Sequence, residues 1–466
     1  MGDTEKESLM AVHIEKPSDP SWAWAAYEPD ALRPWNLAGA GHLCRRAAFG
    51  ADWDQLQRAL SDGPQRTVDN LLSPHADTGA FNLAYDDYEA AAGSVDELRA
   101  WWLRRMIHTP HPLLEKMTLF WHSYFATSGA QVKNARLMGQ HIRLLRGQAL
   151  GSFESLLQGI SRDPAVLIWL GADANRKALP NENFARPLIE TFAIGSGRST
   201  EKDIQEASRA FTGWFVLRDE LRYIPREHDN GIKHFLGQEG DFTRDDVVQI
   251  LLEQPVTSER LVRKLYRWLM SETEEPDAIL IAPLVESFAK DYSVSRLVET
   301  MLRSNLFFSS SASRRRIKCP VEFALGIVKG LEGMVSTTQL AQDLAGLGQN
   351  LYHPPTVKGW TGARHWINSA TMIGRYNLAS ALLQGSGPYA DELSPPAVAQ
   401  KHGRSTFESA ARFLIGLFLQ DDLDSNVYDM LVKTAQTADG AGNDDPAGGI
   451  RRFAHAVITL PEFHLA

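Results

Sequence analysis

The stretch from Asn181 to Gly237 carries the densest set of polar and charged side chains in the chain. It reads NENFARPLIETFAIGSG at 181–197, STEKDIQEASRAFTGW at 199–214 and HDNGIKHFLG at 228–237. Asn181 predicts the N-cap of a helix, and Thr200 followed by Asp203 predicts a capping box for the next helix. Pro187 has no amide hydrogen to donate within the first helix, so we expect a kink or a break there.

Between and after these helices the sequence predicts a β-hairpin at about 214–236. The passage WFVLRDELRYIP at 214–225 alternates imperfectly between apolar and polar residues, as a half-buried strand does. Asn230-Gly231 is a tight-turn signal. A turn at this pair would place three reactive side chains on one rigid loop: His228, Asp229 and Lys233.

Elsewhere the spacing of apolar residues is helical, as in 96–108 and in LLEKMTLFWHSYFAT after Pro112. Residues 73–94 are polar and are predicted to form a loop. The expected fold is therefore mainly α, a large multi-helix globular protein with one small β-hairpin. Its expected divisions are a flexible N-terminal arm at 1–35, a main helical domain at 36–384 and a C-terminal helical segment at 385–466 that packs on the main domain.

Composition excludes some classes of function. The 48 basic and 57 acidic residues give a net charge of −9, which does not favour nucleic acid as a partner. The two cysteines, Cys44 and Cys319, are too few for a disulfide framework or a cysteine-rich metal site. No apolar run approaches the roughly 18 residues that a membrane span needs. The N-terminal residues show no secretory signal, so a cytoplasmic location is expected.

The polar residues of the central stretch are the candidate site. The candidate catalytic residues are Glu182, Glu190, His228 and Asp229, and the candidate ligand-binding residues are Asn183, Arg186, Lys233, Trp214 and Trp360. Carboxylates beside a histidine suit acid–base chemistry, and their oxygens could bind a divalent cation. The basic side chains suit an anion, and the tryptophans suit a sugar ring.

The same residues also fit a buried polar network without any ligand, and the sequence leaves both interpretations open. Glu182, Arg186 and Glu190 share one helix face, since they follow each other at intervals of four residues. Arg186 is expected to be partly buried there, so that its removal would cost about 3 kcal/mol.

Seven phrases together resemble a bacterial family, the domain of unknown function 1800. They are FWHSYFAT at 120–127, NENFARPLIETFAIG at 181–195, RAFTGW at 209–214, HDNGIKHFLG at 228–237, KCPVEF at 318–323, PPTVKGW at 354–360 and LPEF at 460–463. The resemblance implies a mainly α-helical fold with a small hairpin and no established activity. Members are often secreted and encoded beside sulfatase-like proteins. Pro187 stands where the family usually has glutamate, so one family carboxylate is missing.

These observations lead to two hypotheses about function. The first is a hydrolase-like or transferase-like enzyme that acts on a polar, anionic or glycan substrate. The second is a non-enzymatic binding or assembly protein in which the polar cluster is structural. The expected partners are a small-molecule or glycan ligand and, through the resemblance, a sulfatase-like protein.

Overall fold

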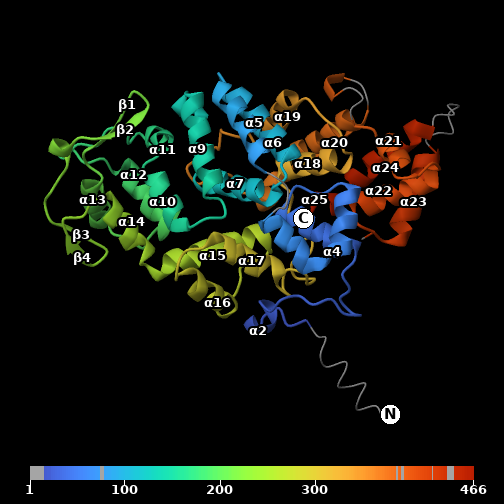
Figure 1. Cartoon of the computed structure of the whole chain (residues 1–466), viewed down its shortest axis with the longest axis horizontal. Coiled ribbons are helices and arrows are strands. Elements are labelled where there is room, and N and C mark those ends of the chain that lie inside the picture. The colour runs from blue at the N-terminus through green and yellow to red at the C-terminus, as the bar shows by residue number, and fades with distance from the viewer. Residues whose placement is uncertain (1–14, 74–77, 385–386, 390–392, 422, 438–445) are drawn as a thin grey trace, which may run out of the picture.

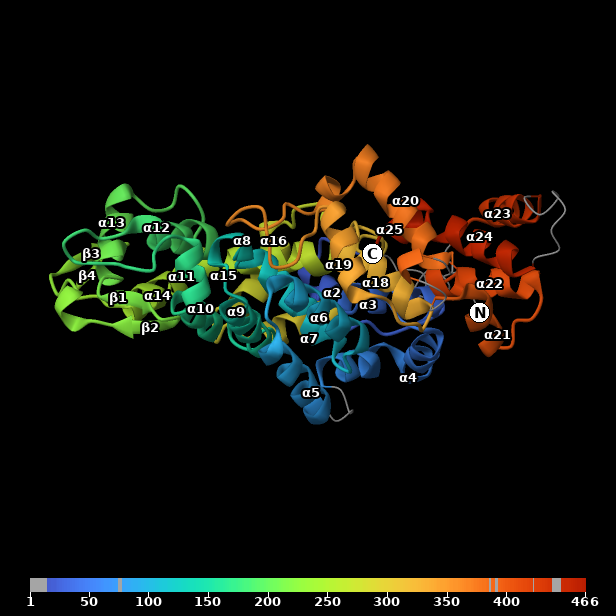
Figure 2. The same cartoon turned by 90° about the horizontal axis from the view of Figure 1, so that it is seen from above.

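The computed structural model describes residues 15–73, 78–384, 387–389, 393–421, 423–437 and 446–466. The chain is mainly α, as predicted, and it forms an elongated body (Figure 1). Two small hairpins lie at one end of this body and the helices α21 to α24 lie at the other, in both views (Figure 2). None of the helices in the described ranges has the length and apolar character that a bilayer crossing requires.

The first part of the described chain forms helices. They are α2 (Pro20–Ala23), α3 (Leu37–Ala47), α4 (Trp53–Leu72), α5 (Thr78–Ala91), α6 (Val95–His108) and α7 (Pro112–Tyr124). The helix α5 shows that the predicted loop at 73–94 was wrong over 78–91. Phe81 and Tyr85 stack on one face of α5, and the Arg105 guanidinium of α6 lies over both rings. These packing contacts outweigh the polar composition that suggested a loop.

The next part leads to the hairpin end. It contains α8 (Gly129–Val132), α9 (Ala135–Gly147), α10 (Phe153–Ser161), α11 (Pro164–Trp169), α12 (Glu182–Arg186), the π-helix η1 (Pro187–Ala193) and α13 (Glu201–Ala210). The predicted break at Pro187 is confirmed, because α12 ends at Arg186 and the wider turns of η1 begin with the proline. The capping box of Thr200 with Asp203 is confirmed at the start of α13.

The structure has two hairpins where the sequence predicts one. Strand β1 (Trp214–Leu217) pairs with β2 (Glu220–Tyr223), and β3 (Lys233–Phe235) pairs with β4 (Gln238–Gly240). Their turns are Arg218-Asp219 and Leu236-Gly237, all at positive φ. Asn230-Gly231 lies between the hairpins instead, where the Asp229 carboxylate accepts a hydrogen bond from the Gly231 amide at 2.8 Å.

The second half of the chain is again helical. It contains α14 (Arg244–Leu252), α15 (Pro255–Leu269), α16 (Ala278–Phe288), α17 (Val294–Arg303), α18 (Pro320–Gly330), α19 (Thr337–Gly346), α20 (Ser369–Leu383), α21 (Pro395–Lys401), α22 (Phe407–Phe418), α23 (Ser425–Thr437), α24 (Pro446–Ile458) and α25 (Pro461–His464). Short 3₁₀ turns are η2 (Pro225–Glu227), η3 (Ala363–Trp366) and η4 (Gly387–Tyr389). A loop joins α19 to η3, and it carries the phrase PPTVKGW at 354–360.

Residues 15–35 lie against the body of the protein. The Trp24 indole donates a hydrogen bond to the carbonyl of Leu280 at 2.6 Å, and the Tyr27 amide donates to the carbonyl of Arg303 at 2.7 Å. Residues 1–14 of the predicted arm lie outside the described residues. The division of the chain into an arm, a main domain and a C-terminal segment stays a prediction.

Candidate functional site

The first group of predicted site residues lies on α12 and η1 and forms a surface ion-pair group. The Arg186 guanidinium lies 2.9 Å from the carboxylate of Glu182 and 3.9 Å from that of Glu190. It also lies 2.7 Å from the carboxylate of Glu201 on α13. The side chain of Arg186 is 37% exposed, so the residue is partly buried, as expected, but its ion pairs are open to solvent. The Asn183 amide donates to the carbonyl of Gly171 at 3.3 Å.

Because these pairs are exposed, we predict a small effect for Arg186→Ala. Water and mobile ions screen such pairs, so the free energy of unfolding should fall by only about 0.5–1 kcal/mol. Chemical denaturation of the variant and of wild type measures this difference. A fall of about 3 kcal/mol in the free energy of unfolding, the value expected for removal of one member of a buried ion pair, would contradict this prediction.

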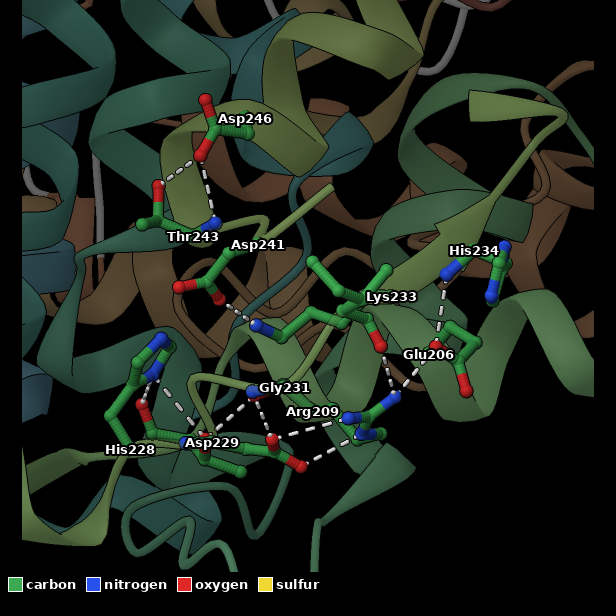
Figure 3. A network of polar contacts seen from close by, with 12 residues as sticks. Glu206, Arg209, His228, Asp229, Gly231, Lys233, His234, Asp241, Thr243 and Asp246 are labelled. Carbon is green, nitrogen blue, oxygen red and sulfur yellow. Dashed lines mark hydrogen bonds and ion pairs between the residues drawn. The ribbon is translucent and has the colours of Figure 1, made fainter. Parts of the chain in front are cut away.

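The second group of predicted site residues lies between the hairpins (Figure 3). His228 is buried, and its Nδ1 lies 2.9 Å from the carbonyl oxygen of Thr212. Both carboxylate oxygens of Asp229 accept hydrogen bonds from the Arg209 guanidinium, at 2.7 and 3.2 Å. These contacts hold the segment after η2 against the end of α13.

Lys233 and Trp214 complete this second group. The Lys233 side chain is fully buried, and its Nζ donates to the Asp241 carboxylate at 2.7 Å, away from Asp229 (Figure 3). Trp214 packs under the Arg244 guanidinium, which lies 4.2 Å from the ring centroid. The Nδ1 of His228, the Asp229 carboxylate and the Lys233 ammonium each have a protein partner, which favours a structural role in joining the hairpins to α13 and α14.

Helix α13 separates the two groups. Arg186 contacts Glu201 at its first residue, whereas Asp229 contacts Arg209, eight residues further on. Eight residues span about 12 Å along a helix axis. Within the described residues, no hydrogen bond or ion pair joins one group directly to the other. The polar contacts therefore do not gather the predicted residues around one point.

A cavity of about 420 Å³ lies beside η1. Two of the predicted residues line it, Glu190 from η1 and Trp360 from the loop after α19. The other walls come from α7, from α15 and from the start of α18. Four of the phrases quoted above contribute lining residues, namely FWHSYFAT, NENFARPLIETFAIG, KCPVEF and PPTVKGW. Segments far apart in the sequence thus meet at this cavity.

The cavity has a surplus of cationic residues over acidic ones. Arg260, Lys264, Arg267 and Lys358 line it, against Glu190 and Glu272. Burial, with Arg260 and Arg267 nearby, lowers the pKa of Lys264 below its ordinary value. Among the contacts of the described residues, neither the Lys264 ammonium nor that of Lys358 has a hydrogen-bond acceptor. An anion in the cavity would supply one.

Two buried donors of the cavity wall also lack an acceptor in the described part of the chain. They are Nε of Arg260 and Nε1 of Trp268. A different nitrogen of Arg260 donates to the carbonyl of Thr191 at 2.9 Å, which fixes the guanidinium beside η1. Buried donors are costly when unsatisfied, so a site that collects them suits a ligand rich in acceptor oxygens.

Glu272 is an acidic residue of the cavity with a shifted pKa. Burial raises its pKa above the ordinary glutamate value, although Arg316 and a hydrogen bond from the Ile317 amide at 3.1 Å oppose this shift. Raised pKa values of carboxyl groups in clefts are typical of general acids. The pKa of Cys319 is raised by burial to about 12, so its thiol is a poor nucleophile.

Below the cavity floor lies a buried charge cluster. The Glu322 carboxylate accepts hydrogen bonds from Lys116 and Arg316, and its second oxygen accepts one from the Cys319 amide at 2.9 Å. The Arg316 guanidinium lies 4.7 Å from the ring centroid of Trp268, on the cavity wall. The cluster fixes the start of α18 and adds positive charge beneath the cavity.

Metal binding by the predicted residues has no support from their arrangement. The parts of the chain that the structure describes contain no group of three or more histidine, cysteine, aspartate or glutamate residues placed to hold a metal ion. In the second group, the Arg209 guanidinium engages both oxygens of Asp229.

The family model described as Protein of unknown function (DUF1800) matches residues 42–465. The chain belongs to this family. The match covers nearly the whole chain, which confirms the resemblance drawn from the seven phrases. Comparisons with curated proteins and with solved structures gave no match. DUF1800 membership therefore supplies the family but no activity, and the argument for function rests on the cavity.

Sequence reasoning missed the basic residues of α15 and also Glu272. Arg260, Lys264 and Arg267 stand at intervals of four and three residues, so they share one face of the helix. That spacing is visible in the sequence and could have indicated a basic face. Glu272 stands alone after α15, and only the fold places it in the cavity.

Proposed function

We propose that this DUF1800 protein binds an anionic glycan fragment in the cavity of η1 and α15, and acts on it as a hydrolase-like or transferase-like enzyme. One observation carries the proposal. The cavity where four family phrases meet holds unpaired cations, unsatisfied donors and a carboxyl group of raised pKa. The proposal leaves out His228, Asp229 and Lys233, because the His228 Nδ1, the Asp229 carboxylate and the Lys233 ammonium are engaged by protein partners.

The ligand class follows from the lining. Lys264 and Lys358 would hold a carboxylate, sulfate or phosphate group, since both ammonium groups reach the cavity without a protein acceptor. Trp360 and Trp366 offer apolar ring faces from the loop that closes the cavity. A sugar ring has an apolar face and a rim of hydroxyl oxygens, so it matches such rings together with the donors of Arg260 and Trp268.

The two carboxyl groups of the cavity suit acid–base chemistry. Protonated Glu272 would donate its proton to the oxygen of the leaving group as the bond to that oxygen breaks. Glu190 would accept a proton from the attacking water or sugar hydroxyl. The oxygen of the attacking group then ends on the substrate, and the leaving group departs as an alcohol. Arg260 and Lys264 would keep the anionic substrate in place.

We predict that Glu272→Gln retains binding and loses turnover. Methyl glucuronide and methyl galacturonide are suitable substrates, because methanol is a poor leaving group that needs an acid. With wild type, mass spectrometry should detect the free uronic acid, and the rate should fall as the pH rises through the pKa of Glu272. Glutamine keeps the acceptor for the Ile317 amide but gives up no proton, so the rate should fall about 100-fold or more.

Binding is followed separately by thermal stabilisation of the protein with galacturonic acid. Lys264→Gln should abolish this stabilisation, whereas Lys290→Gln, which removes an exposed cation outside the cavity, should leave it unchanged. Stabilisation of wild type without any turnover would favour the second candidate, a non-enzymatic binding protein. The engaged polar groups of His228 and Asp229 favour that candidate, because they remove two predicted catalytic residues. No stabilisation of wild type would contradict the proposal as a whole.

A further inference from the structure

A second cavity, of about 330 Å³, adjoins the first at α15. The two cavities share four lining residues, which are Ser196, Arg260, Lys264 and Arg267. Arg260 and Arg267 are seven residues apart, which is about 10 Å along the helix axis. The wall that the two cavities share is therefore longer than one sugar ring, and together they form a trough that a single small anion would leave mostly empty.

The second cavity adds its own cations, Arg198 and Arg263. Arg263 is engaged by protein groups, since it pairs with Glu259 at 2.8 Å and donates to the carbonyl of Pro276 at 2.7 Å. Arg198 is exposed and has no hydrogen-bond or ion-pair partner among the described residues. Cations without a protein acceptor thus line both cavities, with Lys358 in the first, Arg198 in the second and Lys264 in both.

Backbone conformation brings the loop after η1 close to α15. Gly195 and Gly197 have φ of +94° and +77°, values that disfavour residues with a side chain. A Cβ atom at Gly195 would lie 3.1 Å from a nitrogen of the Arg260 guanidinium. The glycines thus let the chain turn tightly beside Arg260, and this turn carries Ser196 and Arg198 to the second cavity.

We infer that the ligand is a linear glycan with at least two anionic groups, one held by Lys264 and Lys358 and the next by Arg198. This inference rests on the proposed function and deepens it. Cations without acceptors in two adjoining cavities would be matched by charges that repeat along a chain. A glycan is preferred to a nucleic acid because this inference starts from the sugar-binding cavity of the proposed function, and the net charge of −9 disfavours a long polyanion of either kind outside the trough.

The test compares galacturonic acid with its linear trimer, by calorimetry, on wild type and on Arg198→Gln. Wild type should bind the trimer on the order of tenfold more tightly, as expected for one further charge-assisted contact. Arg198→Gln should lose this preference and keep the affinity for the monomer. Its matched control, Lys290→Gln, should behave as wild type. Because Arg198 is exposed, the variant should keep its fold, and circular dichroism checks this.

The possible results distinguish a failure of this inference from a failure of the proposed function. Equal affinity for monomer and trimer, or a preference that survives in Arg198→Gln, would overturn the inference and leave the proposed function standing. No binding of either galacturonate would contradict the proposed function itself. A uridine oligonucleotide of three residues that binds more tightly than the trimer, and loses this advantage in Arg198→Gln, would overturn the glycan class in favour of nucleic acid.

Discussion

Glu322→Gln is expected to lower the free energy of unfolding by about 3–5 kcal/mol. The carboxylate is 3% exposed and is shared by Lys116 and Arg316, both buried. Glutamine has nearly the same shape but no charge, so two buried cations would lose the carboxylate that they share. Removing one partner of a buried ion pair costs more than the pair itself contributes. Urea unfolding followed by circular dichroism measures the difference.

The matched control is Glu299→Gln, which removes a carboxylate that pairs with Arg303 at 2.9 Å but is 42% exposed. It should change stability by no more than about 0.5–1 kcal/mol. Equal effects of the two substitutions would show that the buried cluster is not what fixes α18.

The same cluster gives the stability of wild type a pH dependence. Burial alone would raise the pKa of Glu322, but Arg316 and Lys116 hold it well below the usual range. A carboxyl group whose pKa is lower in the folded state stabilises the fold above its unfolded pKa of about 4.3. That contribution should fade as the pH falls from about 4 downwards, and Glu322→Gln should lack this part of the acid dependence.

Gly359→Ala is expected to displace the loop that carries Lys358 and Trp360. Gly359 has a φ of +73°, and a Cβ atom there would overlap the backbone carbonyl of Ser123 on α7. A shift of either backbone costs free energy, and we expect the loop to be displaced from its position at the cavity. We expect the free energy of unfolding to fall by more than about 2 kcal/mol and the binding of galacturonate to be lost. Thermal unfolding and calorimetry measure the two effects.

Gly403→Ala separates backbone strain from the overlap. Gly403 has nearly the same φ, +75°, but nothing lies within 4 Å of the position of the added Cβ. Gly403→Ala should therefore lower the free energy of unfolding only by the strain of a positive φ, about 1–2 kcal/mol, and should leave ligand binding unchanged. If Gly359→Ala costs no more than this control and still binds galacturonate, the loop is not held as described.

Local signals predicted much of the fold. Pro187 ended α12 because a missing amide hydrogen acts within one turn, and Thr200 with Asp203 capped α13 for an equally local reason. Asn230-Gly231 misled, because the Asp229 amide and the Ile232 carbonyl, which would close a hairpin across this pair, bond to Thr212 and Arg209 instead. Helix α5 was missed because its stability depends on contacts with α6, which are not local.

The candidate site was less predictable. Glu190 and Trp360 were named from the sequence and do line the cavity, but Glu182 and Arg186 pair with each other at the surface. His228 and Asp229 were named for their residue types, whereas His228 is buried and Asp229 is bonded to the Arg209 guanidinium, contacts that favour a structural role. Glu272 acquires its raised pKa only from the fold around it, so no spacing in the sequence could reveal it.

The central claim is that the cavity between η1, α15 and the loop at 354–362 holds an anionic sugar. A crystal structure of the protein soaked with the galacturonate trimer tests it most directly. The account predicts one carboxylate within about 3 Å of the Lys264 or Lys358 ammonium and a sugar ring against Trp360. A trimer bound elsewhere, for instance beside His228 and Asp229, with the cavity filled by water alone, would contradict it.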